Sequence, residues 1–243
     1  MKRAAARPRR RQATAARGCG GKRYARKAKT ASSKFKIQNS KVGAVRSANR
    51  KSQIQNRKLL PPAPRLQELY DKLLAHWGPQ KWWPAESPFE VMVGAILTQN
   101  TAWRNVEQAI ANLKGAGMLD PQALHYAPVE AVAQLIRPSG FFNVKARRLK
   151  SFLDFYFCEA GGSYARLIAI PTKDLREKLL EGQGLGPETV DSILLYALNR
   201  PVFVVDAYTR RILKRHFLIQ GGEDYEVIRG MFEYHLPRAR GLF

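Results

Sequence analysis

The sequence is poor in cysteine, lacks long apolar runs and has no acidic residue among its first 60 positions. Its 2 cysteines are too few for a disulfide framework or for a Cys-rich zinc or iron–sulfur site, so we expect no metal and no cofactor. No apolar stretch approaches the roughly 20 residues that a membrane-spanning helix needs, and no apolar segment follows the N-terminal charges as in a secretory signal. These absences predict a soluble chain in a reducing compartment, with no membrane partner.

Basic residues dominate what is present. The formal net charge is +23, and residues 1–60 hold 20 of the 42 Lys and Arg but none of the 19 Asp and Glu. A chain this basic binds polyanions, so we expect nucleic acid as the partner, ahead of an acidic membrane surface. Because the rest of the chain is nearly balanced in charge, the excess belongs to the N-terminal segment.

Composition divides the chain near residue 61. Residues 1–61 have no hydrophobic periodicity and are predicted to be a disordered basic tail, whereas residues 62–243 are predicted to fold. We expect a cytoplasmic or nucleoid location. The alternative is an organelle, because an Arg-rich, acid-free N-terminus is also typical of transit peptides.

The folded part is predicted to be all-α. Apolar residues recur with helical spacing from Leu66 to Leu74 and in eight later segments, namely residues 90–98, 103–113, 128–136, 144–157, 174–180, 188–198, 207–217 and 225–234. The run at residues 202–205 is the best strand candidate, but it lies between Pro201 and Asp206 without a partner strand. We therefore interpret it as a buried connector.

A glycine hairpin joins two of these helices. Gly184, Leu185 and Gly186 separate residues 174–180 from a helix that Pro187 opens. Glycine tolerates positive φ and close approach of a ligand, and the free N–H groups at the next helix start favour a phosphate oxygen. The pattern predicts a DNA-backbone contact, although it is also compatible with a simple tight turn.

A single carboxylate follows at a fixed distance. The connector delivers Asp206 to the start of a basic helix that carries Arg210 and Arg211, both candidate DNA contacts. Aspartate is a common N-cap, so a structural role is the alternative. Together, the hairpin and Asp206 favour a functional site.

Three segments together resemble the endonuclease III (helix-hairpin-helix-GPD) superfamily of DNA glycosylases over about residues 66–240: residues 89–101, Gly184-Leu185-Gly186 and Val204-Val205-Asp206. Within it, Trp82-Trp83-Pro84 and residues 137–143 are most similar to the 3-methyladenine DNA glycosylase branch. The resemblance implies double-stranded DNA as partner, two helical subdomains with the active site in a cleft between them, and Asp206 as the catalytic residue. We expect a monomer.

One departure from endonuclease III bears on the chemistry. Bifunctional members carry a lysine nucleophile two residues after the second glycine, and this chain has Glu188 there, so no amine is available for a Schiff base. We predict a base-excision repair enzyme that hydrolyses the N-glycosidic bond without cutting the strand. The alternatives are a glycosylase/lyase that uses another lysine, and a non-catalytic DNA-binding protein.

The base pocket is assigned by the same resemblance. Trp82, Trp83, Pro84 and Trp103 are the expected pocket residues, and Gln99 is expected to face the DNA near the gap left by the flipped base. Stacking on tryptophan favours an electron-poor alkylated purine, the substrate that we predict. Packing of Trp82 and Trp83 in the core is the alternative.

The C-terminal end departs from the resemblance. The sequence stops at Phe243, soon after the last predicted helix, where the 3-methyladenine branch continues with a further helix. We therefore expect a domain truncated at its C-terminus, with reduced stability and uncertain activity.

Overall fold

The computed structural model describes residues 63–80, 83–182 and 184–236. The chain divides into two units, residues 1–50 and residues 51–243, and every described residue belongs to the second. The predicted tail, Trp82 and the C-terminal residues 237–243, to which the expected truncation refers, lie outside the described residues.

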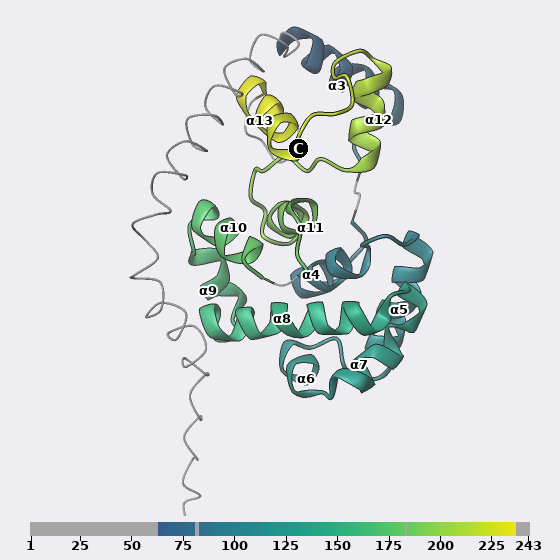
Figure 1. The fold of residues 1–243 in the computed structure, drawn as a ribbon, viewed down its shortest axis with the longest axis vertical. Coiled ribbons are helices and arrows are strands. Elements are labelled where there is room, and N and C mark those ends of the chain that lie inside the picture. The colour runs from purple at the N-terminus through teal and green to yellow at the C-terminus, as the bar shows by residue number, and fades with distance from the viewer. Residues whose placement is uncertain (1–62, 81–82, 183, 237–243) are drawn as a thin grey trace, which may run out of the picture. The chain divides into compact units, whose positions relative to one another are not determined.

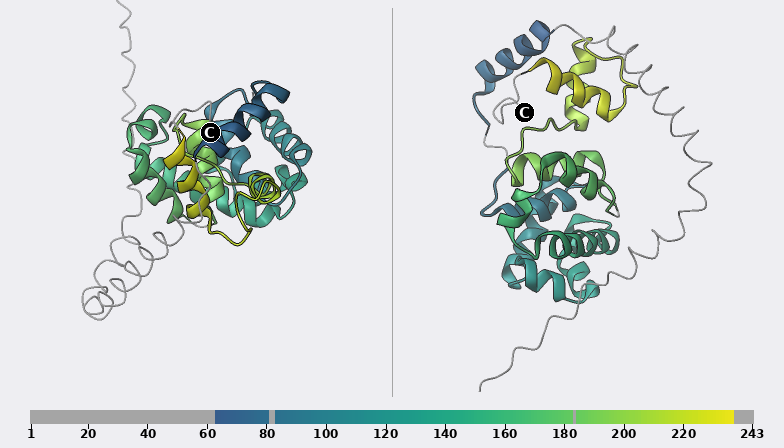
Figure 2. Two further views of the ribbon diagram at one scale, coloured as in Figure 1. Left: turned by 90° about the horizontal axis from the view of Figure 1, so that it is seen from above. Right: turned by 90° about the vertical axis from the view of Figure 1, so that its left-hand side faces the viewer.

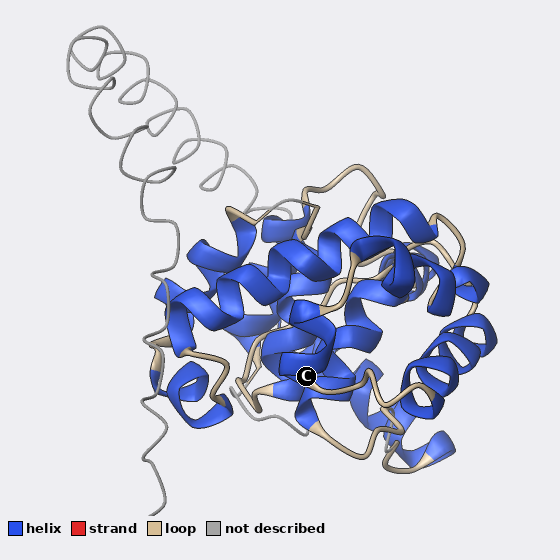
Figure 3. Cartoon of the chain, turned by 90° about the horizontal axis from the view of Figure 1, so that it is seen from below, coloured by secondary structure: helices blue, strands red, loops and turns tan. Residues whose placement is uncertain are grey.

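The described part consists of helices and loops, without a strand (Figures 1 and 3), which confirms the predicted all-α class. Its α-helices are α3 (Ala63–Trp77), α4 (Pro88–Leu97), α5 (Trp103–Gly115), α6 (Pro121–Tyr126), α7 (Val129–Leu135), α8 (Phe142–Ala160), α9 (Tyr164–Ala169), α10 (Thr172–Leu180), α11 (Pro187–Ser192), α12 (Ala207–Arg215) and α13 (Tyr225–His235). A 3-10 turn, η1 (Arg137–Ser139), precedes α8, and a π-helical turn, η2 (Ile193–Ala197), follows α11. Residues 202–205 belong to no helix or strand, as the predicted connector requires, and Val202 and Val205 are buried.

Three elements differ from the sequence expectations. Helices α6 and α9 were not anticipated, because one and a half turns are too short to show hydrophobic periodicity. Their caps were the available signal: Asp120 precedes Pro121 and accepts two backbone N–H groups, and Ser163 caps α9. The helix predicted over residues 188–198 is present, but it changes from α-helical to π-helical geometry at Ile193.

The larger hydrophobic cluster surrounds α4 and α8. All residues of α4 except Pro88 are buried, as expected of a helix that is apolar on every side. Helix α8 packs against α4, α6, α7 and α9, and the views in Figure 2 show these helices gathered along it. This cluster, defined here as the hairpin-side core, also includes buried residues of α10, α11 and η2.

The smaller cluster joins the two ends of the described chain. Its nine buried residues include Leu66 of α3, Leu213 of α12 and Ile228 of α13. We call it the aspartate-side core because Val205, the residue before Asp206, belongs to it. Within the described ranges, no helix has the length and apolar character needed to cross a membrane.

A polar network lies where α10, α11 and α13 meet. The fully buried Asp191 accepts two hydrogen bonds from the Arg176 guanidinium, at 2.6 and 2.9 Å. Arg176 also donates to the Glu226 carboxylate of α13 at 2.6 Å. Arg229 Nε, also on α13, lies 3.9 Å from Asp191 Oδ2. Charged groups buried in this way must be paired, so the network ties α13 to the hairpin-side core.

Candidate active site

The glycine hairpin has the geometry that its sequence predicts. Gly184 has a φ of +81°, in the left-handed region that favours glycine, and it is exposed. Leu185 is buried in the hairpin-side core, which anchors the turn. Gly186 is the N-cap of α11 and Pro187 its first residue, so the backbone N–H groups at this helix start have no side-chain cap. The turn therefore exposes the backbone of Gly184 and Gly186 to solvent, while the buried Leu185 side chain holds it in place.

Gln99 braces the hairpin from the end of α4. Its amide nitrogen donates to the Gly184 carbonyl at 3.2 Å and to the Thr189 hydroxyl at 2.8 Å. The Arg148 guanidinium donates to the amide oxygen of Gln99 and lies against the Cα side of Gly184. In this structure both ends of the Gln99 amide are thus engaged with protein groups, and its DNA-facing role stays a prediction.

Asp206 is held at the start of α12. It is the N-cap of that helix, and its Oδ1 accepts the Thr209 N–H at 2.6 Å. The connector before it is fixed by α13: Phe203 N–H donates to the Glu233 carboxylate at 3.1 Å, and Val205 N–H donates to the Tyr225 hydroxyl at 3.3 Å. One carboxylate oxygen is therefore fixed by the backbone, and the residue as a whole is half-exposed.

Glu188 lies close to Asp206. Burial raises the pKa of Glu188, the negative charge of Asp206 raises it further, and Arg210 acts in the opposite direction. A carboxyl group, and not an amine, therefore stands beside Asp206 at the hairpin-side helix start. Among the described residues, no group of three or more His, Cys, Asp or Glu side chains is arranged to hold a metal ion.

The two arginines predicted on α12 differ in their surroundings. Arg210 donates to the Glu223 backbone carbonyl at 2.7 Å, so part of its hydrogen-bonding capacity supports the loop before α13. Arg211 is exposed, with its guanidinium carbon 5.1 Å from the centre of the exposed Tyr208 ring. Arg211 and Tyr208 are thus available to a ligand near Asp206.

The aromatic residues form a cluster over α4. The Trp83 ring lies 5.5 Å from the Trp103 ring, edge-on, and 5.2 Å from the Tyr196 ring, tilted by 39°. Gly94 makes room for it, because a Cβ there would lie 3.2 Å from Trp83 Cζ2. Pro84 is exposed next to this cluster.

Two aromatic residues of this region were missed at the sequence level. Tyr196 was counted as part of a regular helix, although an aromatic residue ten positions before Asp206 was a usable signal. Phe141 is 67% exposed and has a φ of +45°, an uncommon backbone for a bulky residue. The buried Lys145 bonds both the Ser139 and the Leu97 carbonyls, at 2.6 and 2.8 Å, which places this turn beside the end of α4.

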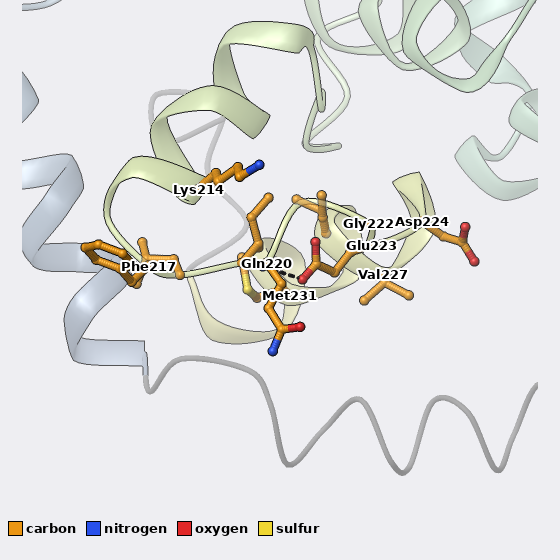
Figure 4. Close-up of a pocket in the computed structure, with 11 residues that line it drawn as sticks. Lys214, Phe217, Gln220, Gly222, Glu223, Asp224, Val227 and Met231 are labelled. Atoms are coloured by element: carbon orange, nitrogen blue, oxygen red, sulfur yellow. Dashed lines mark hydrogen bonds between the residues drawn. The ribbon is translucent and has the colours of Figure 1, made fainter.

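A separate cavity of about 790 Å³ opens at the other end of α12 (Figure 4). Lys214, Phe217 and Met231 are among its lining residues, and none of the predicted site residues lines it. Asp206 precedes the first turn of α12 and Lys214 lies in the last, so roughly 12 Å of helix separates them. The cavity is therefore not the place where Asp206 acts.

Comparisons with known proteins agree on one family. The profile described as "HhH-GPD superfamily base excision DNA repair protein" matches residues 93–237. A candidate DNA repair glycosylase of Methanocaldococcus jannaschii is 46% identical over 179 residues, which is 72% of this chain and 80% of the relative. The matched region includes the hairpin, Asp206 and most of the aromatic cluster.

Solved structures are similar as well. The H. pylori 3-methyladenine DNA glycosylase MagIII, bound to 1,N6-ethenoadenine, has a TM-score of 0.64 and 30% identity and covers 74% of this chain and 91% of its own. A trapped endonuclease III–DNA covalent intermediate has a TM-score of 0.63 at 17% identity, covering 76% and 86%. The second likeness bears on the fold alone.

Proposed function

The chain belongs to the HhH-GPD superfamily of base excision DNA repair proteins, and from this premise we propose that it releases an alkylated purine from duplex DNA without cleaving the strand. The resemblance predicted from the sequence is thereby confirmed, and the chain is a DNA glycosylase. The identity of the base, the absence of lyase activity and a monomeric state are the proposed parts.

The observation that carries the proposal is the carboxyl group of Glu188 beside Asp206. A lyase needs a lysine amine within reach of C1′, and the hairpin position that supplies it in endonuclease III holds Glu188 here. Asp206 is left to act on the sugar with water as the nucleophile.

Two lysines of α8, the buried Lys145 and the partly buried Lys150, support the same conclusion. Burial lowers the pKa of Lys145 to about 8, with a further contribution from Arg148. Such a lysine could be nucleophilic, but its ammonium is buried and bonded to two carbonyls. Lys150 likewise donates to the carbonyls of Leu124, His125 and Ala127. Neither amine is placed to attack a flipped nucleotide.

The base would stack in the aromatic cluster. Trp83, Trp103 and Tyr196 present flat, electron-rich faces, and such faces favour a cationic or electron-poor ring. The H. pylori relative was solved with a modified purine, which supports a purine as the class of base. Trp82, next in sequence, is proposed as a further wall.

The DNA would be held by three surface features around this cluster. The exposed hairpin backbone binds a phosphate, Arg211 adds a charged contact, and the exposed Phe141 ring stacks on bases next to the flipped nucleotide. Phosphate contacts position the duplex without reading its sequence, so the damaged base supplies the specificity.

Asp206 would then promote bond cleavage. As the C1′–N9 bond lengthens, positive charge develops on the sugar, and the carboxylate stabilises it. The bond electrons leave with the base, a water oxygen bonds to C1′, and a water proton passes to the carboxylate. An abasic site remains in an intact strand.

A panel of single-lesion duplexes tests this function. We expect release of 7-methylguanine or 3-methyladenine, no release of thymine glycol, and strand breaks only after alkali. Borohydride should trap no covalent adduct. A trapped adduct would establish the lyase alternative, and release of none of the bases would leave a non-catalytic DNA-binding protein.

A further inference from the structure

Tyr196 lies in an irregular turn of its helix. Leu198 N–H donates to the carbonyl of Ile193, five residues earlier, at 3.2 Å, so one extra residue is accommodated in the turn. Leu195 and Ala197 on either side are buried, whereas Tyr196 is only partly buried. Single π-helical turns of this kind are frequent at functional sites because they redirect a side chain. Here the redirected side chain is Tyr196.

The Tyr196 ring forms one wall of the aromatic cluster. It lies 5.2 Å from Trp83, and Trp83 in turn lies over Gly94. The glycine fixes how closely Trp83 approaches α4, so the spacing between the two rings is set by backbone. The Tyr196 ring thus packs against Trp83, which lies in the segment before α4.

Two nearby tyrosine hydroxyls, unlike that of Tyr196, bond to the backbone of described residues. Tyr164 donates to the Ala197 carbonyl at 3.1 Å, and the Tyr225 hydroxyl accepts the Val205 N–H. Within the described residues, the Tyr196 hydroxyl makes no hydrogen bond. A partly buried hydroxyl without a partner is a group for which a bound ligand supplies one.

The surroundings keep this hydroxyl a donor. Burial raises the pKa of Tyr196, and the negative charge of Asp206 raises it further. The phenol therefore keeps its proton at neutral pH. Because the charge of Asp206 influences the Tyr196 hydroxyl, the two groups lie within electrostatic reach of each other.

We propose, resting on the glycosylase function above, that Tyr196 is a substrate-contacting residue whose hydroxyl donates a hydrogen bond to the damaged base beside the glycosidic bond. In a purine the acceptor at that edge is N3. When the C1′–N9 bond breaks, its electron pair goes to the base, so an uncharged purine leaves as an anion. A hydrogen bond to N3 stabilises that anion, while Tyr196 keeps its own proton.

The consequence concerns the class of substrate. A base that is already cationic, such as 7-methylguanine, leaves as a neutral molecule and gains little from the hydrogen bond. An uncharged lesion such as hypoxanthine gains more. Tyr196 therefore extends the activity from cationic alkylated purines to uncharged damaged purines.

Tyr196→Phe isolates the hydroxyl, because it keeps the ring against Trp83. Single-turnover release of hypoxanthine should fall about 10- to 100-fold, the size of one hydrogen bond to a charged group. Release of 7-methylguanine should change less than about 3-fold on the same reasoning. Tyr126→Phe, at a tyrosine that is 77% exposed on α6, should leave both rates unchanged.

The outcomes separate the possible errors. An unchanged rate of hypoxanthine release would overturn the role of the hydroxyl. An equal fall in the release rates of both lesions would overturn it as well, and a lower melting temperature of the variant would then indicate a structural role. If the wild-type chain releases 7-methylguanine but not hypoxanthine, this inference fails and the proposed function stands. If it releases neither base, the proposed function itself fails.

Discussion

The hairpin and Asp206, the two parts of the proposed site, are held by different kinds of packing. The hairpin is anchored by Leu185 in the large hairpin-side core, whereas Asp206 stands at the edge of nine buried residues in the aspartate-side core. Its connector depends on directional contacts to Glu233 and Tyr225. Apolar burial is not directional and tolerates small shifts of the backbone, whereas a hydrogen bond weakens steeply when its distance or angle changes. DNA binding should therefore be more robust than catalysis.

The strongest test removes the charge of Asp206 and leaves both cores intact. Asp206→Asn keeps a side-chain oxygen that can cap α12, so the free energy of unfolding should change by less than about 0.5 kcal/mol. Base release should fall by at least about 1,000-fold, because the sugar cation loses its counter-charge. Single-turnover release and urea unfolding measure the two effects.

A matched substitution separates chemistry from capping. Asp120 caps α6 by accepting the N–H groups of Gln122 and Ala123, and it belongs to no part of the site. Asp120→Asn should leave base release unchanged. If Asp206→Asn retained a rate within tenfold of the original, Asp206 would be an N-cap only.

The second test breaks the network between the two cores. Asp191→Asn leaves the Arg176 guanidinium without its buried counter-charge, and we expect a loss of about 3–5 kcal/mol in the free energy of unfolding. Glu226→Gln removes the half-exposed partner of the same arginine and should cost less than about 1 kcal/mol. If the two substitutions lowered the free energy of unfolding equally in urea, the burial of Asp191 would not determine how strongly its ion pair with Arg176 stabilises the protein.

The third and smallest effect concerns the hairpin itself. Gly184→Ala places a side chain at a φ of +81° and against Arg148, so we expect about 1–2 kcal/mol of destabilisation and weaker DNA binding. Gly186→Ala is the control, because Gly186 has a φ of −83° and open space around it. Its stability should change by less than about 0.5 kcal/mol. If the Gly184→Ala variant bound DNA normally, the hairpin would not need a glycine at this position for DNA binding.

The all-α class and the hairpin followed from the sequence because they depend on local signals. Apolar spacing identified the long helices, and Gly184 and Pro187 marked the turn and the next helix start. The hydrogen bond from the Gln99 amide to the Gly184 carbonyl was not predicted, and it joins residues 85 positions apart. Contacts of that separation have no local pattern.

The aromatic cluster shows a second limit. Trp83 and Trp103 were assigned to the base pocket through the family resemblance, but Tyr196 lies within an apolar helical repeat and was not singled out. Periodicity assumes 3.6 residues per turn, and the π-helical turn at η2 departs from that value. Phe141 was missed for a similar reason, since its exposure depends on a left-handed backbone that a phenylalanine rarely adopts.

The contacts of the connector make catalysis sensitive to partial opening of the protein. The backbone N–H groups of Phe203 and Val205 donate to side chains of α13, so fraying of that helix would loosen Asp206 while the hairpin, Gln99 and Arg148 stay in place. Local openings of this sort require less free energy than global unfolding. A heat-stressed molecule would then still occupy damaged DNA but no longer excise the base, and so would shield the lesion from intact enzymes. Faster hydrogen exchange at Phe203 and Val205 would report this state before the other helices unfold.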